Sequence, residues 1–316
     1  GIRRIPASTM LVLRGVKTPA PSATVLTIGN FDGVHLGHQA LLARVGQAAR
    51  ACGLPAAVLT FEPHPREFFD PASAPARLTT LREKLELLQN YGADLTCVSP
   101  FNTVFAALTA DEFIEQVLVR CLRVRHLIIG DDFRFGARRA GDFALLQAAG
   151  ASFGFQVEAM ESVVQGGERA SSSGVREALA AGDMARAARL LGRPYSIDGR
   201  VVHGQKLGRQ LGFATANIRI KHNPLPLTGV FAVSVTGAAG RPLNGVANLG
   251  VRPTVGGQLQ PLLEVHLFDF DGDIYGAHLS VSFLHKLRDE MKFPDFNALV
   301  AQIGQDAEAA RAFFQR

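Results

Sequence analysis

The sequence predicts two domains: an α/β domain built on a parallel sheet, followed by a small antiparallel β-barrel that ends in a helix. Residues 24–182 alternate short, continuous apolar runs with helical patterns, which is typical of buried parallel strands with helices on both faces. After a helical stretch at 183–191 the chain becomes β-rich, and Gly and Pro interrupt the strands at short spacing, as in a small barrel. We expect the domains to span residues 1–185 and 186–316.

The first domain is expected to contain five strands separated by helices, in the order of a Rossmann-like domain. A capping box, Thr80-Leu81-Arg82-Glu83, opens one helix and places Leu81, Leu85 and Leu88 on one face. The expected strands are residues 24–28, 56–61, 95–98, 126–129 and 155–159, and the other helices are expected over 38–51, 109–120 and 141–149.

The second domain is expected to be mainly β-structure. Its clearest strands are residues 229–235, 262–268 and 279–284, where apolar residues recur at the spacing of extended chain. A final amphipathic helix is expected from about residue 294 to the end, with an apolar face made by Phe296, Leu299, Val300 and Ile303.

Length and composition limit the classes to which the protein can belong. The 316 residues are 47% hydrophobic and 19% charged, so large cores can form. No apolar run approaches the roughly 18 residues of a membrane span, and no signal-peptide pattern follows the first residues, so a cytoplasmic location is expected. Cys52, Cys97 and Cys121 lie far apart, which argues against a zinc site or a disulfide framework.

The net charge of +5 and the pI of about 9.4 allow two interpretations. One is a nucleic-acid partner, and the other is a mildly basic enzyme that acts on phosphate-rich substrates. The basic residues are spread along the chain, and Arg123-Val124-Arg125-His126 and Arg138-Arg139 come nearest to clusters. No strand interleaves basic and aromatic residues, so we expect neither a nucleic-acid nor a membrane partner.

The segment from Gly29 to His38 carries the strongest chemical signal. It has a His-x-Gly-His core at the point where the first strand gives way to a helix. Ligands of open parallel sheets bind beyond the carboxyl ends of the strands, and a helix N-terminus offers free N–H groups to anions. His35 and His38 lie one helical turn apart, so both rings can face one phosphate group. The alternative is a pair of incidental loop histidines. The segment predicts a nucleoside triphosphate site and nucleotidyl transfer, with these residues: Gly29, Asn30, Phe31, Asp32, Gly33, His35 and His38.

Two further segments should reach the same edge of the sheet. Gly130 to Gly136 follows the fourth expected strand, and Arg169 to Arg176 follows the fifth and opens a helix. The hydroxyls of Ser171, Ser172 and Ser173, the free N–H groups and the Arg176 guanidinium could together clamp a triphosphate. A plain helix N-cap is an equally good explanation of these serines.

The β-rich half contains a second set of candidate residues. A loop that begins near Gly199 combines four glycines with three basic residues and includes His203, Gly204 and Gly208; such a loop could fold over phosphates. Thr215 and Asn217 are two residues apart, so an extended chain places both oxygens on one face, a donor set that suits Mg²⁺ bound to ATP phosphates. Glu264 could take the proton from a substrate hydroxyl, although a solvated strand face would also explain it.

The motif sets of both halves resemble, in order, those of the bacterial bifunctional riboflavin kinase/FAD synthetases. The first half resembles His-x-Gly-His nucleotidyltransferases through residues 29–38, 60–65, 130–136 and 171–176, and the second resembles riboflavin kinases through residues 215–217, 248–254, 264–266 and 287–293. The resemblance implies the following roles: His35 and His38 on the ATP phosphates, Ser171 to Arg176 in the same nucleotide site, Phe61, Glu62, Asp132 and Arg288 at flavin, Thr215 and Asn217 on Mg²⁺–ATP, and Glu264 as catalytic base.

The resemblance also implies the reactions. The barrel would phosphorylate riboflavin with ATP to give FMN, and the α/β domain would transfer AMP from ATP to FMN, giving FAD and pyrophosphate. The expected partners are therefore riboflavin, FMN, FAD and ATP with Mg²⁺, and the expected assembly is a monomer or weak oligomer. Two positions depart from the family: Glu62 replaces the usual Asp, and Ala214 replaces the usual Pro. The alternative functions are a nucleotidyltransferase of another specificity and a basic nucleic-acid-binding protein.

Overall fold

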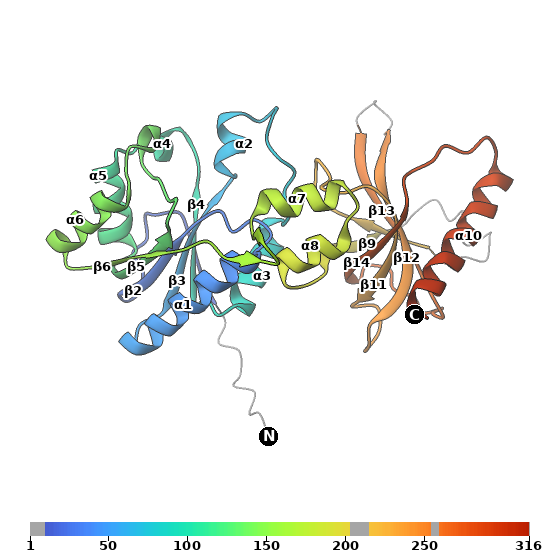
Figure 1. Cartoon of the computed structure of the whole chain (residues 1–316), viewed down its shortest axis with the longest axis horizontal. Coiled ribbons are helices and arrows are strands. Elements are labelled where there is room, and N and C mark those ends of the chain that lie inside the picture. Colours follow the sequence, from blue (N-terminus) through green and yellow to red (C-terminus); the bar gives the residue numbers. More distant parts are fainter. Residues whose placement is uncertain (1–9, 203–214, 254–258, 316) are drawn as a thin grey trace, which may run out of the picture. The chain divides into compact units, whose positions relative to one another are not determined.

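The computed structural model describes residues 10–202, 215–253 and 259–315, and most of its helices and strands are labelled in Figure 1. The chain forms two compact units. The first unit runs to Pro75 and continues over Leu81–Ala170; the second contains Ala76–Thr80 and everything from Ser171 onward. This division comes earlier in the chain than the expected boundary after residue 185, because two helices that follow residue 171 bury their apolar side chains in the core of the second unit.

The first unit is built on a six-stranded sheet whose paired strands are all parallel, as predicted. The strand order is β1-β4-β3-β2-β5-β6, so the chain moves from β2 to one side through β3 and β4 and returns to the other side at β5. The change of direction lies between β2 and β5, which is where such sheets bind ligands. The strands are β1 (Leu11–Arg14), β2 (Thr24–Ile28), β3 (Ala56–Glu62), β4 (Leu95–Pro100), β5 (Val124–Gly130) and β6 (Gln156–Met160).

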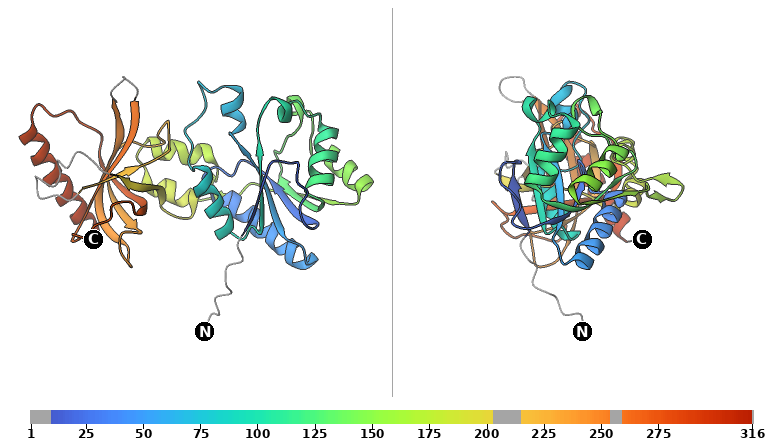
Figure 2. Two further views of the ribbon diagram at one scale, coloured as in Figure 1. Left: turned by 180° about the vertical axis from the view of Figure 1, so that it is seen from behind. Right: turned by 90° about the vertical axis from the view of Figure 1, so that its left-hand side faces the viewer.

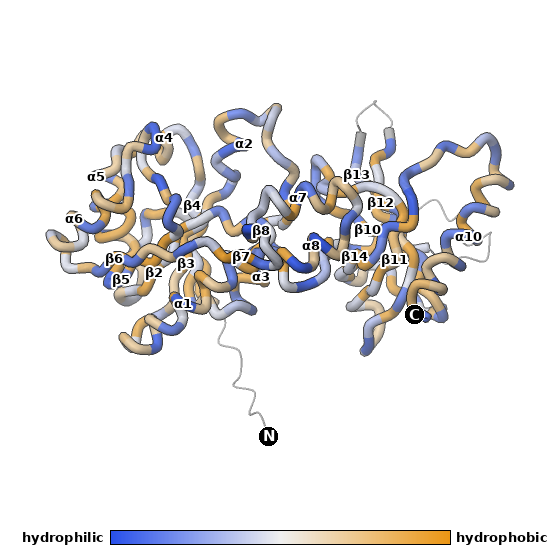
Figure 3. Tube along the Cα trace, in the orientation of Figure 1, coloured by the Kyte–Doolittle hydropathy of each residue, from blue (hydrophilic) through white to orange (hydrophobic). Residues whose placement is uncertain are grey.

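Helices cover both faces of this sheet (Figures 1 and 2). One apolar cluster joins Val25, Val58 and Ile128 of the strands to helices α1 and α3, and the alternate strand residues join η1 and α6 on the opposite face. The central strands are accordingly mostly apolar (Figure 3), and β2 is buried at all five positions, including Thr24 and Thr27. The helices are α1 (Leu36–Cys52), α2 (Pro65–Phe69), α3 (Leu81–Asn90), α4 (Thr103–Ala106), α5 (Ala110–Glu112), the π-helix η1 (Phe113–Cys121), the 3-10 helix η2 (Ala137–Arg139) and α6 (Phe143–Phe153), followed by the hairpin β7 (Val164–Gln165) and β8 (Glu168–Arg169).

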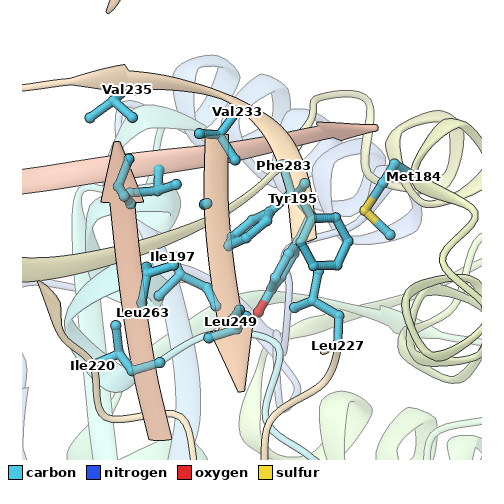
Figure 4. Packing of buried hydrophobic residues seen from close by; sticks show 14 of the residues in the cluster. Met184, Tyr195, Ile197, Ile220, Leu227, Val233, Val235, Leu249, Leu263 and Phe283 are labelled. Atoms are coloured by element: carbon cyan, nitrogen blue, oxygen red, sulfur yellow. The ribbon is translucent and has the colours of Figure 1, made fainter. Parts of the chain in front are cut away.

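The second unit contains a closed antiparallel barrel, in the order β10-β13-β12-β11-β14-β9. Its interior is filled by apolar side chains, among them Tyr195, Ile197, Val233, Leu263 and Phe283 (Figure 4). Closure leaves no open sheet edge. The elements are α7 (Ser172–Ala180), α8 (Met184–Leu191), β9 (Tyr195–Val202), β10 (Thr215–Arg219), β11 (Gly229–Thr236), β12 (Leu243–Pro253), β13 (Leu259–Leu267), β14 (His278–Arg288) and α10 (Phe296–Phe314).

The terminal helix α10 is present as expected and turns the expected face to the barrel, but the burial of that face is concentrated toward its C-terminal half. Its buried residues are Asp306, Ala307 and Ala310, whereas Phe296 is 46% exposed. The alanines allow α10 to lie close against Val230, Ala232 and Val246 of the barrel, a closeness that hydropathy alone does not reveal. In the part of the chain that the structure describes, no helix is long and apolar enough to cross a membrane.

The short segment Ala76–Thr80 belongs to the second unit although both of its flanks belong to the first. Leu78 is fully buried in the barrel cluster. Its carbonyl oxygen accepts a hydrogen bond of 2.9 Å from the Tyr195 hydroxyl, and the Arg176 Nε donates to the Ala76 carbonyl oxygen at 2.7 Å. The chain therefore passes from the first unit into the second and back before it reaches the barrel.

Replacing Leu78 by Ala should lower the free energy of unfolding by about 2–5 kcal/mol, because the substitution leaves a cavity in a packed core. Chemical denaturation of the full chain measures the loss. Val104→Ala is the control, since Val104 is 77% exposed and exposed substitutions change stability by less than about 0.5 kcal/mol. A Leu78→Ala loss as small as that of the control would contradict the assignment of this segment to the core.

Candidate nucleotide and flavin sites

The loop that joins β2 to α1 holds an unusual backbone conformation. Phe31, Gly33 and Val34 have φ angles of 50°, 79° and 41°, in the left-handed region that residues with a side chain rarely adopt. Phe31 and Val34 are fully buried, and the Gly29 N–H donates to the Leu59 carbonyl oxygen of β3 at 3.1 Å. Burial thus holds a strained loop in place, an arrangement typical of functional sites.

His35 and His38 lie at the N-terminus of α1, as the sequence predicted. His35 is the N-cap residue and makes no capping hydrogen bond with its side chain. The two rings stack with their centroids 3.7 Å apart at 25°, and the Phe31 ring lies 4.9 Å from that of His38. A Cβ atom at Gly37 would lie 3.1 Å from the His35 ring, so glycine keeps this position open. The pair therefore sits beside the free N–H groups of a long helix.

Two polar atoms of this loop have no hydrogen-bond partner among the described residues: His38 Nδ1 and Asn30 Oδ1, both buried. Buried polar atoms are normally satisfied, so these two point to a ligand. Asp32, in the same loop, is 4% exposed. The loop residues that the sequence analysis assigned to nucleotide binding are thus gathered at one place.

Lys84 was missed in the sequence analysis and lies near this pair. Burial, then the neighbouring charges of His35 and Lys84, lower the pKa of His38 well below its usual value of 6.5, so His38 is neutral at pH 7. Lys84 is on α3 and only 4% exposed. A signal was available: Lys84 falls three residues after Leu81 and four before Leu88, on the apolar face of its helix, where a lysine is unusual.

A group of phenylalanines lies at the carboxyl ends of β3 and β4. Phe61, at the end of β3, contacts Phe101 and Phe105, with centroids 5.7 and 5.6 Å away. Phe68 and Phe69 of α2 meet Phe101 edge-on, each at 5.6 Å, and Phe69 is 69% exposed. Of these residues only Phe61 was assigned from the sequence. The adjacent Phe68-Phe69 pair and Phe101, each following a strand end, were the missed signal. Glu62 is half-buried beside this group.

The loop after β5 is held by an ion pair. Asp132 Oδ2 accepts a hydrogen bond of 2.8 Å from Arg169 Nη2, and the rings of Phe133 and Phe135 stack at 5.8 Å. Asp132 is exposed, so its side chain is accessible to a ligand. Its predicted contact with flavin stays a prediction.

The serine-rich segment opens helix α7 in the second unit. The Ser171 hydroxyl caps that helix, accepting from the Gly174 N–H at 3.1 Å, and the Arg176 Nε donates to Ala76. The N-cap explanation is therefore correct for Ser171. A nucleotide role for Ser171, Ser172, Ser173 and Arg176 stays a prediction, because His35 and His38 belong to the other unit.

In the barrel, the register of three strands gathers the second set of candidates. Asn217 of β10 lies opposite Glu264 of β13, and Asn248 of β12 faces Glu264 from the other side. Thr215 lies opposite His266. The alternating residues of the same strands, such as Leu263 and Val265, are fully buried, so the polar set lies on the outer face. Both Thr215 and Asn217 are extended, as predicted.

Glu264 is paired with an arginine that was not assigned a role from the sequence. Arg252 Nη2 lies 2.7 Å from Glu264 Oε2. The pair holds the carboxylate in one orientation beside Asn217. His203, Gly204 and Gly208, which were predicted to bind nucleotide, and the Ala214 departure lie outside the described residues. Among the residues that are described, no group of three His, Cys, Asp or Glu side chains could hold a metal ion.

Arg288 is engaged by the terminal helix. Its Nε and Nη2 atoms donate to the two carboxylate oxygens of Asp306 at 2.8 and 2.7 Å. Its Nη1 donates to the Asp289 carbonyl oxygen at 2.8 Å. The expected flavin contact of this residue stays a prediction. In the structure, Asp306 and the Asp289 carbonyl oxygen hold the guanidinium in one orientation.

The comparisons with known proteins match each half separately and the chain as a whole. Residues 17–174 match the FAD synthetase family, and residues 191–314 match the riboflavin kinase family. The bifunctional riboflavin kinase/FMN adenylyltransferase of Haemophilus influenzae is 54% identical over 289 residues, covering 92% of this chain and 94% of that protein. The Escherichia coli K12 protein of the same name is 50% identical over 308 residues, covering 96% and 98%.

A solved structure has a similar fold. The crystal structure described as a macrolide-efflux protein from Streptococcus pneumoniae is 30% identical, with a TM-score of 0.82, and covers 96% of this chain and 99% of its own. The full-length identity to the two bacterial enzymes and the two family matches confirm the resemblance predicted from the motifs. The chain belongs to the family of bifunctional riboflavin kinase/FMN adenylyltransferases.

Proposed function

We propose that the first unit transfers AMP from ATP to FMN, forming FAD and pyrophosphate, and that the barrel of the second unit transfers the γ-phosphoryl group of ATP to riboflavin. The single observation that best supports this is the stacked His35–His38 pair at the N-terminus of α1, where His38 Nδ1 and the nearby Asn30 Oδ1 are buried without a hydrogen-bond partner among the described residues. It supplies donors for phosphate at the edge of the sheet where ligands bind. The family matches for the two halves agree with this division.

In the first unit, a phosphate oxygen of FMN attacks the α-phosphorus of ATP, and the bond from that phosphorus to the bridging oxygen of pyrophosphate breaks. His35 and His38 donate hydrogen bonds to the phosphoryl oxygens on which charge develops, and the N–H groups of α1 add to this field. Lys84 contributes a buried positive charge beside His38. The acceptor comes from the second substrate, so the first unit needs no nucleophile of its own.

The serine-rich segment is proposed to complete this nucleotide site. A Cβ atom at Gly37 would lie 3.3 Å from the carbonyl oxygen of Ala170, the residue directly before Ser171. Ser172, Ser173 and Arg176 then supply hydroxyl and guanidinium groups suited to the triphosphate.

The isoalloxazine ring of FMN is proposed to lie on the phenylalanine group. Phe61 meets Phe101 edge-on and Phe105 at a tilt, and Phe69 of the same group is largely exposed. Planar aromatic ligands stack on such rings in offset or edge-on geometry. Glu62, next to Phe61 in the chain, and Asp132 of the loop after β5 are proposed to make polar contacts with the flavin.

In the second unit, Glu264 is proposed to take the proton from the ribityl hydroxyl of riboflavin as that oxygen attacks the γ-phosphorus and ADP leaves. Arg252 orients the carboxylate. The Thr215 hydroxyl and the Asn217 amide oxygen, on one face of β10, fit Mg²⁺, which needs few protein ligands when ATP phosphates supply the others. When bound, Mg²⁺ neutralises phosphate charge. His203, Gly204 and Gly208 are proposed to cover the nucleotide. A cytoplasmic location, a monomeric or weakly associating chain and the absence of a nucleic-acid partner stay predictions.

Replacing His38 by Ala should stop FAD formation and leave FMN formation intact, because only the first unit loses a phosphate donor. We expect the rate of FMN adenylylation to fall roughly 10²- to 10³-fold. Incubation with riboflavin and Mg-ATP, followed by chromatographic separation of FMN and FAD, measures both steps. His278→Ala is the matched control, since His278 is exposed on the barrel. Loss of both activities in a folded variant would refute the assignment to two sites.

Replacing Glu264 by Gln or Asn217 by Ala should have the opposite effect. We expect riboflavin phosphorylation to fall roughly 10²- to 10⁴-fold when the base is removed, while conversion of supplied FMN to FAD continues. For Asn217→Ala, the Mg²⁺ concentration that gives half-maximal FMN formation should also rise, because a ligand is lost. Gln260→Ala on the same strand is the control, since Gln260 is exposed. Full kinase activity in Glu264→Gln would rule out Glu264 as the base.

Nucleotide binding to the first unit should be linked to proton uptake by His38. The folded chain keeps this histidine neutral well below pH 6.5, so its burial costs stability as the pH falls below 6.5 and has no effect above it. Anionic phosphates placed beside the ring raise its pKa. We expect more protons to be taken up by the wild type than by His38→Gln near pH 6, measured by calorimetry with a non-hydrolysable ATP analogue in buffers of different ionisation enthalpy. Equal uptake would show that the phosphates do not reach His38.

A further inference from the structure

The terminal helix α10 is tied to the end of β14 by a pair of unusually complete geometry. Arg288 Nε and Nη2 lie 2.8 and 2.7 Å from the two oxygens of Asp306, and Gln302 Nε2 donates to Asp306 Oδ1 at 3.0 Å. Such a bidentate pair fixes the plane of the guanidinium as well as its position. Asp306 is 7% exposed and is the buried acidic residue of α10.

The attachment of α10 does not depend on this pair alone. Ala307 and Ala310 pack in an apolar cluster with Val230 and Phe268 of the barrel, and the Phe313 ring stacks on His285 at 5.1 Å and 4°. A second pair, Arg311–Asp269, joins the same helix to the residues after β13 at 3.1 and 3.2 Å. Because a buried ion pair adds little net stability over an apolar contact, the Asp306–Arg288 pair is better explained by what it positions.

The Asp306–Arg288 pair positions the chain segment that follows β14. Arg288 Nη1 donates to the Asp289 carbonyl oxygen at 2.8 Å, and the guanidinium carbon lies 5.8 Å from the Phe293 ring centroid. The Glu290 carboxylate lies directly over Gly250 of β12, where a Cβ atom would overlap it. Gly250 is two residues from Asn248, which faces Glu264. The segment is thus held at Arg288 and again on the strand that neighbours the proposed base.

The pKa of Glu290 is raised by burial of its carboxyl group, and the positive charges of Arg252 and Arg288 oppose this effect. Arg252 in turn pairs with Glu264. Charges of alternating sign therefore run from α10 to the proposed base: Asp306, Arg288, Glu290, Arg252 and Glu264. Removing the charge of Asp306 would therefore first change the position of the Arg288 guanidinium and of the segment that carries Glu290.

We propose that Asp306 of α10 is a positioning residue of the riboflavin kinase site, which acts by fixing the Arg288 guanidinium and the segment 289–295 next to the strand that neighbours the proposed base, where riboflavin would bind. The proposal rests on the proposed kinase function of the second unit. It makes α10 a part of the substrate site and gives it a role beyond closing the outer face of the barrel.

The test is Asp306→Asn in the full chain, which keeps the shape of the side chain and removes its charge. We expect the KM for riboflavin in FMN formation, and the Kd measured by quenching of flavin fluorescence, to rise roughly tenfold, since small displacements of positioning groups have effects of this order. The kcat value and the KM for Mg-ATP should stay within about twofold, and adenylylation of supplied FMN should not change. Asp306→Glu should restore part of the riboflavin affinity.

Asp269→Asn is the matched control, because it breaks the other Asp–Arg pair of the same helix. A purely structural role of Asp306 predicts fewer folded molecules, and therefore a lower rate of FMN formation with an unchanged riboflavin KM, and an unchanged KM in Asp306→Asn would overturn the proposal. If Asp306→Asn does not fold, Arg288→Lys provides the same test, since lysine keeps the charge but cannot form the bidentate pair; an unchanged riboflavin KM in Arg288→Lys would also overturn it. Failure of the kinase assignment itself is distinguishable, because Glu264→Gln and Asn217→Ala would then leave FMN formation intact.

Discussion

The strained turn between β2 and α1 is the constraint on which the nucleotide site depends. Left-handed backbone at Phe31 and Val34 costs free energy of the order of 1–3 kcal/mol per residue, and the complete burial of both side chains offsets it. The turn delivers α1 with its N-terminus beside the point where the sheet changes direction. His35 and His38 stack there because the helix begins at Leu36. A looser turn would leave the same residues in the sequence without the same geometry.

In the barrel, strand register positions the residues of the proposed site. The register of β10, β13 and β12 places Asn217, Glu264 and Asn248 in one row. Register of this kind is fixed by the apolar residues that alternate with the polar ones, since a slip of one residue would turn the polar set into the core. Core packing and catalytic alignment are therefore set by the same strands, and a mutation that disturbs one disturbs the other.

The sequence predicted the architecture well because its strongest patterns are local. Continuous apolar strands, the capping boxes at Thr80 and Thr109 and the two-residue period around Glu264 all reflect neighbours a few residues apart. The face of α10 was predicted correctly, but the exposure of Phe296 was not, because close packing on the barrel occurs farther along that face, at Ala307 and Ala310. The pairing of Arg288 with Asp306 could not be predicted, since it joins residues on different elements. Family resemblance supplied most of the site assignments. The sequence offered signals for Lys84 and for the phenylalanines, but the proximity of Lys84 to His38 and of Phe61 to Phe101 could be seen only in the folded chain.

The path of residues Ala76–Thr80 has a consequence for how such a bifunctional chain could evolve. Leu78 is encoded within the half that carries the His-x-Gly-His motif, yet it is part of the core of the other half. A gene fission at any single point after this segment would give a kinase polypeptide without one of its own core residues. Separation into two stable proteins would therefore require more than a new stop and start codon. The kinase polypeptide would also need changes around Tyr195 that replace the packing of Leu78 and its hydrogen bond.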